Sequence, residues 1–247
     1  MIRLDDLHID GLKIYQQTDG FRFGTDAVLL AWFAAEKRFR NVVDLCCGNG
    51  IIPLILSARA HNASICGVEI LEEPVKLANM SFEYNGLQDR LRIINGDLRL
   101  LKEEKYLPHA SFDLVTANPP YSAEGTGFVS DGDRGTARTE LCCTSEDVAT
   151  AAAYLLKNSG RLCVINRPER MADIVCAMRN AGIEPKRIMY VCSKPDIAPT
   201  MMMIEGVKGG KSGIKTEPLL EITDRNGKYT AKICEIYGFD KNGKYDG

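Results

Sequence analysis

Residues Asp44-Leu45-Cys46-Cys47-Gly48-Asn49-Gly50 join two apolar segments of different kinds. The first, Val42–Cys47, is short and typical of a buried strand, and the second, Gly50–Ala60, has the length of a helix. Glycines at such a turn allow the backbone to approach a ligand, and the start of a helix favours a negative group. A dinucleotide-binding loop has a similar form, but Pro53 occupies the place of its third glycine. The stretch therefore predicts a ligand-binding turn in an α/β fold.

Strand-like runs alternate with helical patterns between residues 41 and 207. The predicted strands are Val42–Cys47, Ser64–Ile70, Leu91–Asn95, Phe112–Ala117, Arg161–Asn166, Lys186–Cys192 and Met201–Val207. The predicted helices are Gly50–Ala60, Glu72–Tyr84, Ser145–Leu156 and Glu169–Ala181, the third with Ser145 as its N-cap and Gly160 closing it. This alternation predicts a mostly parallel sheet with helices on both faces.

Both ends of the chain lie outside this pattern. Residues 1–40 predict a short hairpin at Leu7–Gln17 and an apolar helix at Asp26–Lys37. Residues 208–247 begin with the glycine- and lysine-rich run Lys208–Lys215, followed by a predicted strand at Leu219–Thr223 and a tight turn at Asn226-Gly227. We expect one domain over residues 1–247, with its core at 41–207 and an extension at each end.

The composition is that of an ordinary globular protein, with 247 residues, 45% hydrophobic and 26% charged. No apolar run approaches the ~20 residues of a membrane span. Nine cysteines without a Cys-x-x-Cys pair, and three isolated histidines, predict neither a disulfide framework nor a metal site. Together with a start that lacks the features of a signal peptide, this predicts a cytoplasmic protein. Because the net charge is −2, any nucleic-acid binding must use local basic patches.

Polar residues stand at the ends of successive predicted strands. Glu69 follows Gly48 by 21 positions (48 to 69), which suits a carboxylate that holds a ribose diol. The third strand runs into Gly96-Asp97 and the fourth into Asn118. Since parallel strands deliver these residues to one edge of the sheet, where ligands bind in open α/β folds, we expect a shared site. For Asp97, a simple helix cap is the alternative.

The fourth strand is followed by Asn118-Pro119-Pro120-Tyr121. Two successive prolines remove two N–H donors and leave the Pro119 carbonyl without a ladder partner. The Asn118 amide adds a second acceptor, and Tyr121 adds a flat aromatic face. This set suits a planar NH2 group on a ring, although a strand end closed by a proline turn is the alternative.

The tetrapeptide resembles motif IV of S-adenosylmethionine-dependent amino methyltransferases, and residues 44–50 resemble their motif I. Cys46 stands where that family often has glycine, which is acceptable if no positive φ is needed there. The resemblance implies a Rossmann-like class I fold, with a seven-stranded, mostly parallel sheet whose seventh strand is antiparallel. It implies S-adenosylmethionine as cofactor and no metal. The implied catalytic residues are Asn118, Pro119, Pro120 and Tyr121, and the implied cofactor residues are Thr25, Asp44, Gly48, Gly50, Glu69, Asp97, Leu98 and Asn118.

The segment from Phe21 to Trp32, which contains Gly24-Thr25-Asp26, resembles the stretch before motif I in the tRNA(Val) adenosine N6-methyltransferase family. Weaker similarity follows at Ala137-Arg138-Thr139, Tyr229-Thr230 and Ile236-Tyr237. The resemblance implies tRNA as partner and the adenosine just 3′ of the anticodon as target. Thr25 and Asp26 have an N-cap pair as their alternative. Arg134, Arg138 and the run Lys208–Lys215 are candidate RNA contacts, with a solvated loop as the alternative for the lysines.

Two other functions fit the same residues. One is methylation of a different amino group, either guanine N2 in RNA or a protein glutamine. The other is an RNA-binding scaffold without activity, against which the intact sequence Asn118–Tyr121 argues. The sequence does not indicate an oligomeric state.

Overall fold

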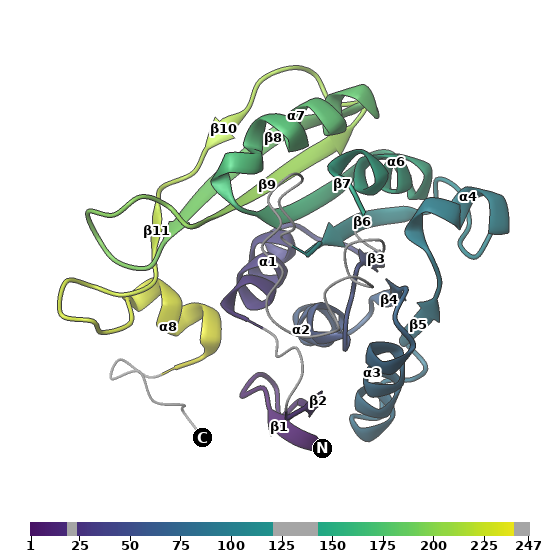
Figure 1. The fold of residues 1–247 in the computed structure, drawn as a ribbon, viewed down its shortest axis with the longest axis horizontal. Coiled ribbons are helices and arrows are strands. Elements are labelled where there is room, and N and C mark those ends of the chain that lie inside the picture. Colours follow the sequence, from purple (N-terminus) through teal and green to yellow (C-terminus); the bar gives the residue numbers. More distant parts are fainter. Residues whose placement is uncertain (19–23, 121–142, 240–247) are drawn as a thin grey trace, which may run out of the picture.

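The computed structural model describes residues 1–18, 24–120 and 143–239, which form a twisted sheet with helices on both sides (Figure 1). Tyr121, Arg134 and Arg138 lie outside the described residues. The main sheet contains β3 (Asn41–Leu45), β4 (Ser64–Glu69), β5 (Leu91–Asn95), β6 (Phe112–Ala117), β7 (Leu156–Asn166), β8 (Ile183–Cys192), β9 (Met201–Lys208), β10 (Lys215–Thr216) and β11 (Leu220–Glu221).

The strand order confirms the predicted fold class. From one edge the order is β5-β4-β3-β6-β7-β9-β8, in which the first five strands are parallel and β9 is antiparallel to both of its neighbours. The predicted count of seven strands is wrong for the described residues, because β10 and β11 extend the sheet to nine by pairing in parallel with β8. Both are two residues long. β11 lies within the strand predicted at Leu219–Thr223, outside the predicted core, whereas β10 begins at the last residue of the run Lys208–Lys215 and was not predicted.

The helices form two layers, one on each face of the sheet. One layer holds α1 (Thr25–Ala35), α2 (Ile51–Arg59), α3 (Glu72–Tyr84) and α8 (Ala231–Tyr237). The other holds the short turns η1 (Leu98–Leu100) and η2 (Pro168–Arg170) with α4 (Leu101–Glu104), α6 (Ser145–Leu155) and α7 (Met171–Asn180). Neighbouring strand residues such as Val42 and Val43 belong to opposite cores, as expected when side chains alternate across a sheet covered on both faces.

The predicted boundaries of α6 need two corrections. Its N-cap is Thr144, not Ser145: the Thr144 hydroxyl and the Asp147 carboxylate each accept a hydrogen bond from the other residue's backbone N–H. The helix ends at Leu155, and β7 begins at Leu156 instead of Arg161. The turn-like residues 157–160 hid this strand, since Leu156 already pairs with Phe112 across an irregularity in the register.

The hairpin before α1 also differs from the prediction of Leu7–Gln17. Its strands are β1 (Ile2–Asp6) and β2 (Lys13–Gln17), and Leu7 lies in the connection, where His8 and Asp10 have positive φ. The hairpin packs on α3. Asn49, in the glycine turn, donates a hydrogen bond from Nδ2 to the backbone oxygen of Tyr15 (3.3 Å). The hairpin is thus joined to the predicted ligand-binding turn.

A buried ionic cluster fixes the C-terminal end of α1 against β7, β8 and β9. The Glu205 carboxylate is fully buried and accepts hydrogen bonds from Lys37 (2.5 Å) and Arg161 (2.8 Å). Arg161 also donates to the carbonyl oxygens of Ala34 and Lys37. The last carbonyls of α1 therefore gain cationic donors, an arrangement that stabilises a helix C-terminus.

Arg187 completes this cluster from β8. Its guanidinium donates to the Phe33 carbonyl oxygen (2.8 Å), pairs with Glu36 and lies 3.8 Å from the centre of the Phe33 ring. It also lies 3.5 Å from Glu205.

The part of the chain that the structure describes contains no helix long and apolar enough to cross a membrane.

Candidate active site

The glycine turn between β3 and α2 has the conformation that a close ligand requires. Gly48 has φ +53°, and a Cβ built there would meet no atom of the described residues within 4 Å, so these residues leave space beside the backbone. Gly50 has φ +82°, but its Cβ would lie 2.8 Å from the Phe82 ring. Gly50 is therefore needed for packing of α2 against α3, whether or not it also contacts a ligand.

The condition under which cysteine was acceptable at position 46, that no positive φ is needed there, is not met. Cys46 has φ +57°, the left-handed conformation that favours glycine. Its side chain lies 3.4 Å from the sulfur of Cys143, just before α6. The turn thus holds a cysteine side chain at a left-handed position where glycine is the favoured residue.

Asp44 is the most buried acid of the predicted cofactor set, with no exposed surface. Thr116, on β6, donates a hydrogen bond from its hydroxyl to Asp44 Oδ1 (2.6 Å). The other oxygen, Oδ2, is buried and has no hydrogen-bond partner among the described residues. The pKa of Asp44 is raised to about 8, mainly because the carboxyl group is buried. The hydrogen bond from Thr116 lowers this pKa, and the negative charge of Glu69 raises it further. A buried carboxylate oxygen without a partner would be stabilised by a cationic group beside it.

The Asp44→Asn variant is expected to be more stable than the wild type at alkaline pH. The folded state raises the pKa from 3.8 to about 8, so ionisation of Asp44 destabilises the fold progressively as pH rises between these values. At 1.36 kcal/mol per pKa unit the gain is at most ~5–6 kcal/mol, and relaxation will reduce it to a few kcal/mol. Chemical denaturation of the ligand-free protein at pH 9 measures the gain, which should shrink as the pH approaches 4. Asp89→Asn, at an exposed site, is the control. A gain in the free energy of unfolding that does not depend on pH would contradict the raised pKa of Asp44.

Glu69 lies next to the glycine turn, as predicted. Its Oε2 accepts a hydrogen bond from the Gly48 N–H (2.9 Å), and its Oε1 accepts one from the Leu71 N–H (2.9 Å). The carboxylate is largely buried, with 8% of the residue exposed. Glu69 therefore shapes the turn in addition to being available to a ligand, since each carboxylate oxygen can accept more than one hydrogen bond.

Asp97 is confirmed as a cap, which was the alternative for this residue. It precedes η1 and accepts a hydrogen bond from the Arg99 N–H (2.9 Å). Hydrogen bonds from the Arg99 side chain hold the pKa of Asp97 below its usual range. The side chain of Leu98 is buried in the core, which leaves its backbone as the part that a ligand can reach. Asp97 lies near Glu69, because the Gly96 N–H donates to the Glu69 backbone oxygen (2.9 Å).

Asn118 follows β6 at the point where the order of the sheet reverses. From β3 the chain continues to β4 on one side, whereas β6 and β7 lie on the other, and ligands bind at such a switch point. Since Leu45 pairs with Ala117, the turn and Asn118 leave the sheet side by side. The Asn118 Nδ2 donates a hydrogen bond to Asp26 Oδ2 (3.0 Å). This partner of Asn118 was not predicted.

The remaining predicted residues have a mixed outcome. Pro119 is buried and Pro120 is exposed, and no described residue donates a hydrogen bond to the Pro119 carbonyl oxygen. Tyr121 lies outside the described residues, so its role stays a prediction. Thr25 is the first residue of α1, but the N-cap is Gly24 without a side-chain cap. The alternative of a Thr25–Asp26 cap pair is therefore wrong.

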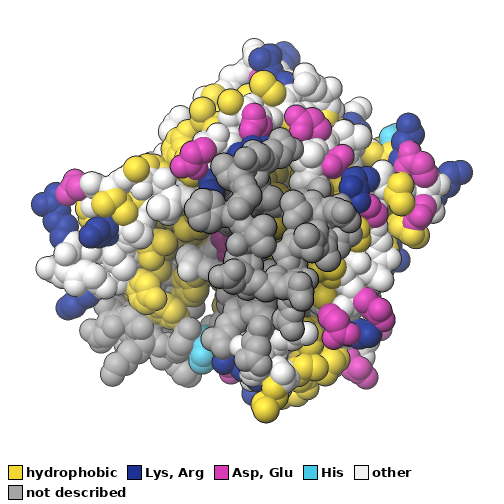
Figure 2. Space-filling model, viewed as in Figure 1, with side chains coloured by type: hydrophobic (Ala, Val, Ile, Leu, Met, Phe, Trp, Pro, Cys, Tyr) yellow, Lys and Arg dark blue, Asp and Glu magenta, His cyan; other side chains and the backbone are white. Residues whose placement is uncertain are grey.

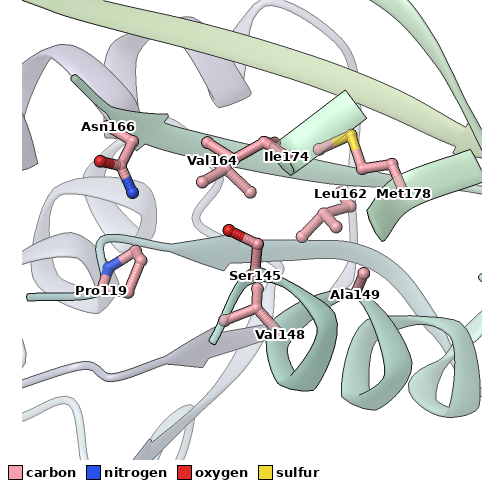
Figure 3. Close-up of a pocket in the computed structure, with 9 residues that line it drawn as sticks. All are labelled: Pro119, Ser145, Val148, Ala149, Leu162, Val164, Asn166, Ile174 and Met178. Atoms are coloured by element: carbon pink, nitrogen blue, oxygen red, sulfur yellow. The ribbon is translucent and has the colours of Figure 1, made fainter. Parts of the chain in front are cut away.

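A pocket opens beside Pro119, just after β6, and lies between β7 and the helices α6 and α7 (Figure 3). Its polar lining is Ser145 and Asn166, and the Ser145 hydroxyl points into it. Its apolar lining is Pro119, Val148, Ala149, Leu162, Val164, Ile174 and Met178. Asn166 was missed by the sequence reasoning, although its position at the end of the next parallel strand was a usable signal.

The candidate RNA contacts in the C-terminal run are partly engaged in the fold. Lys208 donates hydrogen bonds from Nζ to the backbone oxygens of Ala153 (2.6 Å) and Leu156 (2.7 Å), at the end of α6. Lys215 pairs with Glu217 (3.1 Å). Lys208 is therefore a structural residue.

Within the described residues no group of three or more His, Cys, Asp or Glu side chains could hold a metal ion.

The sheet order, the open glycine turn and the strand-end acids define a Rossmann-like methyltransferase of class I. The family model of the methyltransferase small domain matches residues 18–180, and the chain belongs to this family.

Two curated relatives match most of the chain. One, from Flavobacterium johnsoniae, is 28% identical over 225 residues, which cover 91% of this chain and 94% of the relative. Another, from Flavobacterium psychrophilum, is 29% identical over 228 residues, covering 92% and 95%. Both are named tRNA1(Val) (adenine(37)-N6)-methyltransferase. A solved structure of a predicted O-methyltransferase from Agrobacterium tumefaciens has a TM-score of 0.71 at 22% identity, covering 90% of this chain and 97% of that one, and shares the fold.

Proposed function

We propose that the protein transfers a methyl group from S-adenosylmethionine to N6 of an adenosine in tRNA, next to the anticodon. The observation that carries this proposal is the Asn118 amide, held by Asp26 at the switch point beside the glycine turn. The names of the two relatives support the choice of adenosine and of tRNA.

The residues around the turn fit S-adenosylmethionine. The free Oδ2 of buried Asp44 suits the positive charge of this cofactor, and the open backbone at Gly48 leaves room for its amino acid end. Glu69 would accept hydrogen bonds from the ribose hydroxyls, and Asp97 with the backbone of Leu98 would contact the adenine. Gly50 would shape the turn and Thr25 would contact the cofactor from the start of α1. When bound, the cofactor supplies a methyl group on a positively charged sulfur.

The chemical problem is that the N6 lone pair of adenine is delocalised into the ring. Asn118 Oδ1 and the Pro119 carbonyl oxygen would accept hydrogen bonds from the two N6 hydrogens and favour a nitrogen whose lone pair is free. They would also stabilise the positive charge that develops on N6, which is electrostatic preorganisation. Tyr121 would stack on the base, an interaction worth ~1–3 kcal/mol. A base in a tRNA loop is the most easily extruded for this purpose.

The charge distribution predicts that tRNA is held by separate contacts. On the face shown in Figure 2, the visible Lys and Arg side chains lie in several groups with Asp and Glu among them, and no continuous basic stripe crosses the described part of this face. This agrees with the net charge of −2. If tRNA binds through a few phosphate contacts, its binding constant should fall only moderately as the salt concentration rises. Each contact should add ~0.7–0.9 to the slope of log binding constant against log salt concentration.

The Glu69→Ala variant is expected to bind S-adenosylmethionine ~10–150-fold more weakly. This range corresponds to ~1.5–3 kcal/mol, the usual contribution of hydrogen bonds to a charged group. Because Glu69 also accepts hydrogen bonds from Gly48 and Leu71, thermal unfolding should be measured beside calorimetric titration. Glu73→Ala, an exposed acid on α3, is the control. Unchanged affinity in the folded Glu69 variant would refute the role of this residue.

Nucleoside mass spectrometry tests the function itself. The protein is incubated with S-adenosylmethionine and a tRNA pool transcribed in vitro, and the digested tRNA is analysed. N6-methyladenosine that appears with wild type and is nearly lost with Asn118→Ala supports the proposal. N2-methylguanosine, or methylation of glutamine in an added protein substrate, would assign the activity to another amino group. Cofactor binding without any transfer would favour the scaffold function.

A further inference from the structure

We propose that Asp26 is a positioning residue that fixes the orientation of the Asn118 amide for methyl transfer, an inference that rests on the proposed function. The two residues are 92 positions apart and meet through the hydrogen bond from Asn118 Nδ2 to Asp26 Oδ2 (3.0 Å). Asp26 belongs to the first turn of α1, and Asn118 follows β6.

The orientation matters because the two ends of an amide differ in chemistry but hardly in shape. An ionised carboxylate only accepts hydrogen bonds, so it selects the amide nitrogen of Asn118 and fixes Oδ1, which has two acceptor lone pairs, as the opposite end. The target amino group carries the hydrogens to be accepted. The opposite orientation would direct an NH2 donor at another NH2 donor, which is repulsive.

The carboxylate also changes the strength of the acceptor. A hydrogen bond from Nδ2 to a negative group polarises the amide and increases the negative charge on Oδ1. Oδ1 then interacts more strongly with the positive charge that develops on the target nitrogen. Asp26 would therefore act on the reaction through Asn118, with no need to touch the substrate.

The surroundings of Asp26 hold its carboxylate in this orientation. Oδ1 accepts a hydrogen bond from the Ala27 N–H (2.9 Å), which leaves Oδ2 directed at Asn118. A Cβ built at Gly24 would lie 2.6 Å from Asp26 Oδ1, so a side chain there would displace the carboxylate. The φ of Gly24, −97°, is open to any residue, so backbone conformation does not require a glycine there. The space that the Asp26 carboxylate needs does require one.

The position of α1 is fixed from its other end. Arg161 and Arg187 bind the carbonyl oxygens of Ala34 and Phe33, and both pair with the buried Glu205. These contacts connect α1 to β7, β8 and β9 and restrain it along its axis. A helix held in this way can present Asp26 to Asn118 at a constant distance, which preorganisation requires.

A purely structural role for Asp26, as an acid in the first turn of a helix, makes a different prediction. If Asp26 had such a role, the Asp26→Ala substitution would lower the stability of the fold. It would also change the rate of methyl transfer by the same factor whether or not Asn118 is present. A positioning role acts only through Asn118. The two roles are separated by a double-mutant cycle on the rate of methyl transfer.

The cycle compares wild type, Asp26→Ala, Asn118→Ala and the double variant in single-turnover transfer of a labelled methyl group to tRNA. We expect Asp26→Ala to lower the rate ~10–100-fold, as for outer partners that orient the ligands of a metal. Affinity for S-adenosylmethionine and the KM for tRNA should stay within about two-fold, because Asp26 acts on the transfer step. In the Asn118→Ala background, Asp26→Ala should cause no further loss.

Two further variants complete the experiment. Asp26→Asn keeps an oxygen acceptor without the charge, so it should retain more activity than Asp26→Ala, and it remains usable if the alanine variant fails to fold. Asp173→Ala, an acid in the first turn of α7, is the matched control and should leave the rate unchanged. An equal rate loss in both backgrounds, or none in either, would overturn the inference. Absence of N6-methyladenosine with wild type would instead refute the proposed function.

Discussion

The Asn118→Ala variant is expected to bind S-adenosylmethionine like the wild type and to transfer the methyl group ~10²–10³-fold more slowly. Loss of one preorganised polar partner in an active site has an effect of this size. Cofactor affinity should persist, because the residues proposed to form the cofactor turn, Asp44, Gly48 and Glu69, are unchanged. Calorimetric titration of the cofactor and single-turnover transfer to tRNA measure the two effects separately.

The control is Asn180→Ala, which removes an exposed amide at the end of α7. This variant should match the wild type in both measurements. A near wild-type transfer rate in the Asn118 variant would show that the amide takes no part in the reaction. Parallel loss of cofactor affinity and of rate would place Asn118 in cofactor binding instead.

The second large effect is on stability. Glu205→Gln is expected to lower the free energy of unfolding by ~3–5 kcal/mol, the usual effect of removing one member of a buried ion pair. Glu205 lies within hydrogen-bonding distance of Lys37 and Arg161, and Arg161 is itself buried. The neutral amide leaves these cations without a compensating charge. Urea denaturation at neutral pH measures the loss.

The pH dependence of this loss follows from the pKa of Glu205. Burial by itself would raise that pKa, but hydrogen bonds from Lys37 and Arg161 outweigh burial and lower it. A carboxylate with a lowered folded pKa stabilises the fold above its unfolded pKa, and this contribution is lost as pH falls through the folded pKa. The difference in the free energy of unfolding between wild type and Glu205→Gln should therefore reach its full size at neutral pH and become smaller in acid. Glu184→Gln, which breaks the more exposed pair with Arg179, should change stability by only ~0–1 kcal/mol at any pH.

Much of the fold was predictable because its signals are local. Strand β5, strand β6 and helix α3 have the predicted boundaries, since each is a continuous apolar or amphipathic segment bounded by polar residues. The errors lie where two local signals compete. Thr144 and Ser145 are both good N-caps, and the choice depends on the bond to Asp147. In β7, a turn-like sequence concealed a strand that its pairing with β6 stabilises.

The composition of the site was predictable in kind, but its connections were not. Chain order alone indicated that Asp44, Glu69, Asp97 and Asn118 follow parallel strands. The contact of Asn118 with Asp26 depends on how α1 crosses the sheet, and no local pattern encodes that. The demand for glycine at position 50 likewise comes from the Phe82 ring, on a different helix. Both are tertiary constraints that act across long separations in the chain.

The hairpin has a practical consequence for anyone who shortens this protein. The match to the methyltransferase small domain begins at residue 18, which would suggest that the preceding segment is dispensable. Yet the Tyr15 carbonyl oxygen accepts a hydrogen bond from Asn49, the Tyr15 N–H donates one to the Ser81 hydroxyl, and Lys13 exchanges two with Asn85. A truncation at the homology boundary would remove the hairpin that connects the glycine turn to α3. Expression boundaries should therefore include both strands of the hairpin.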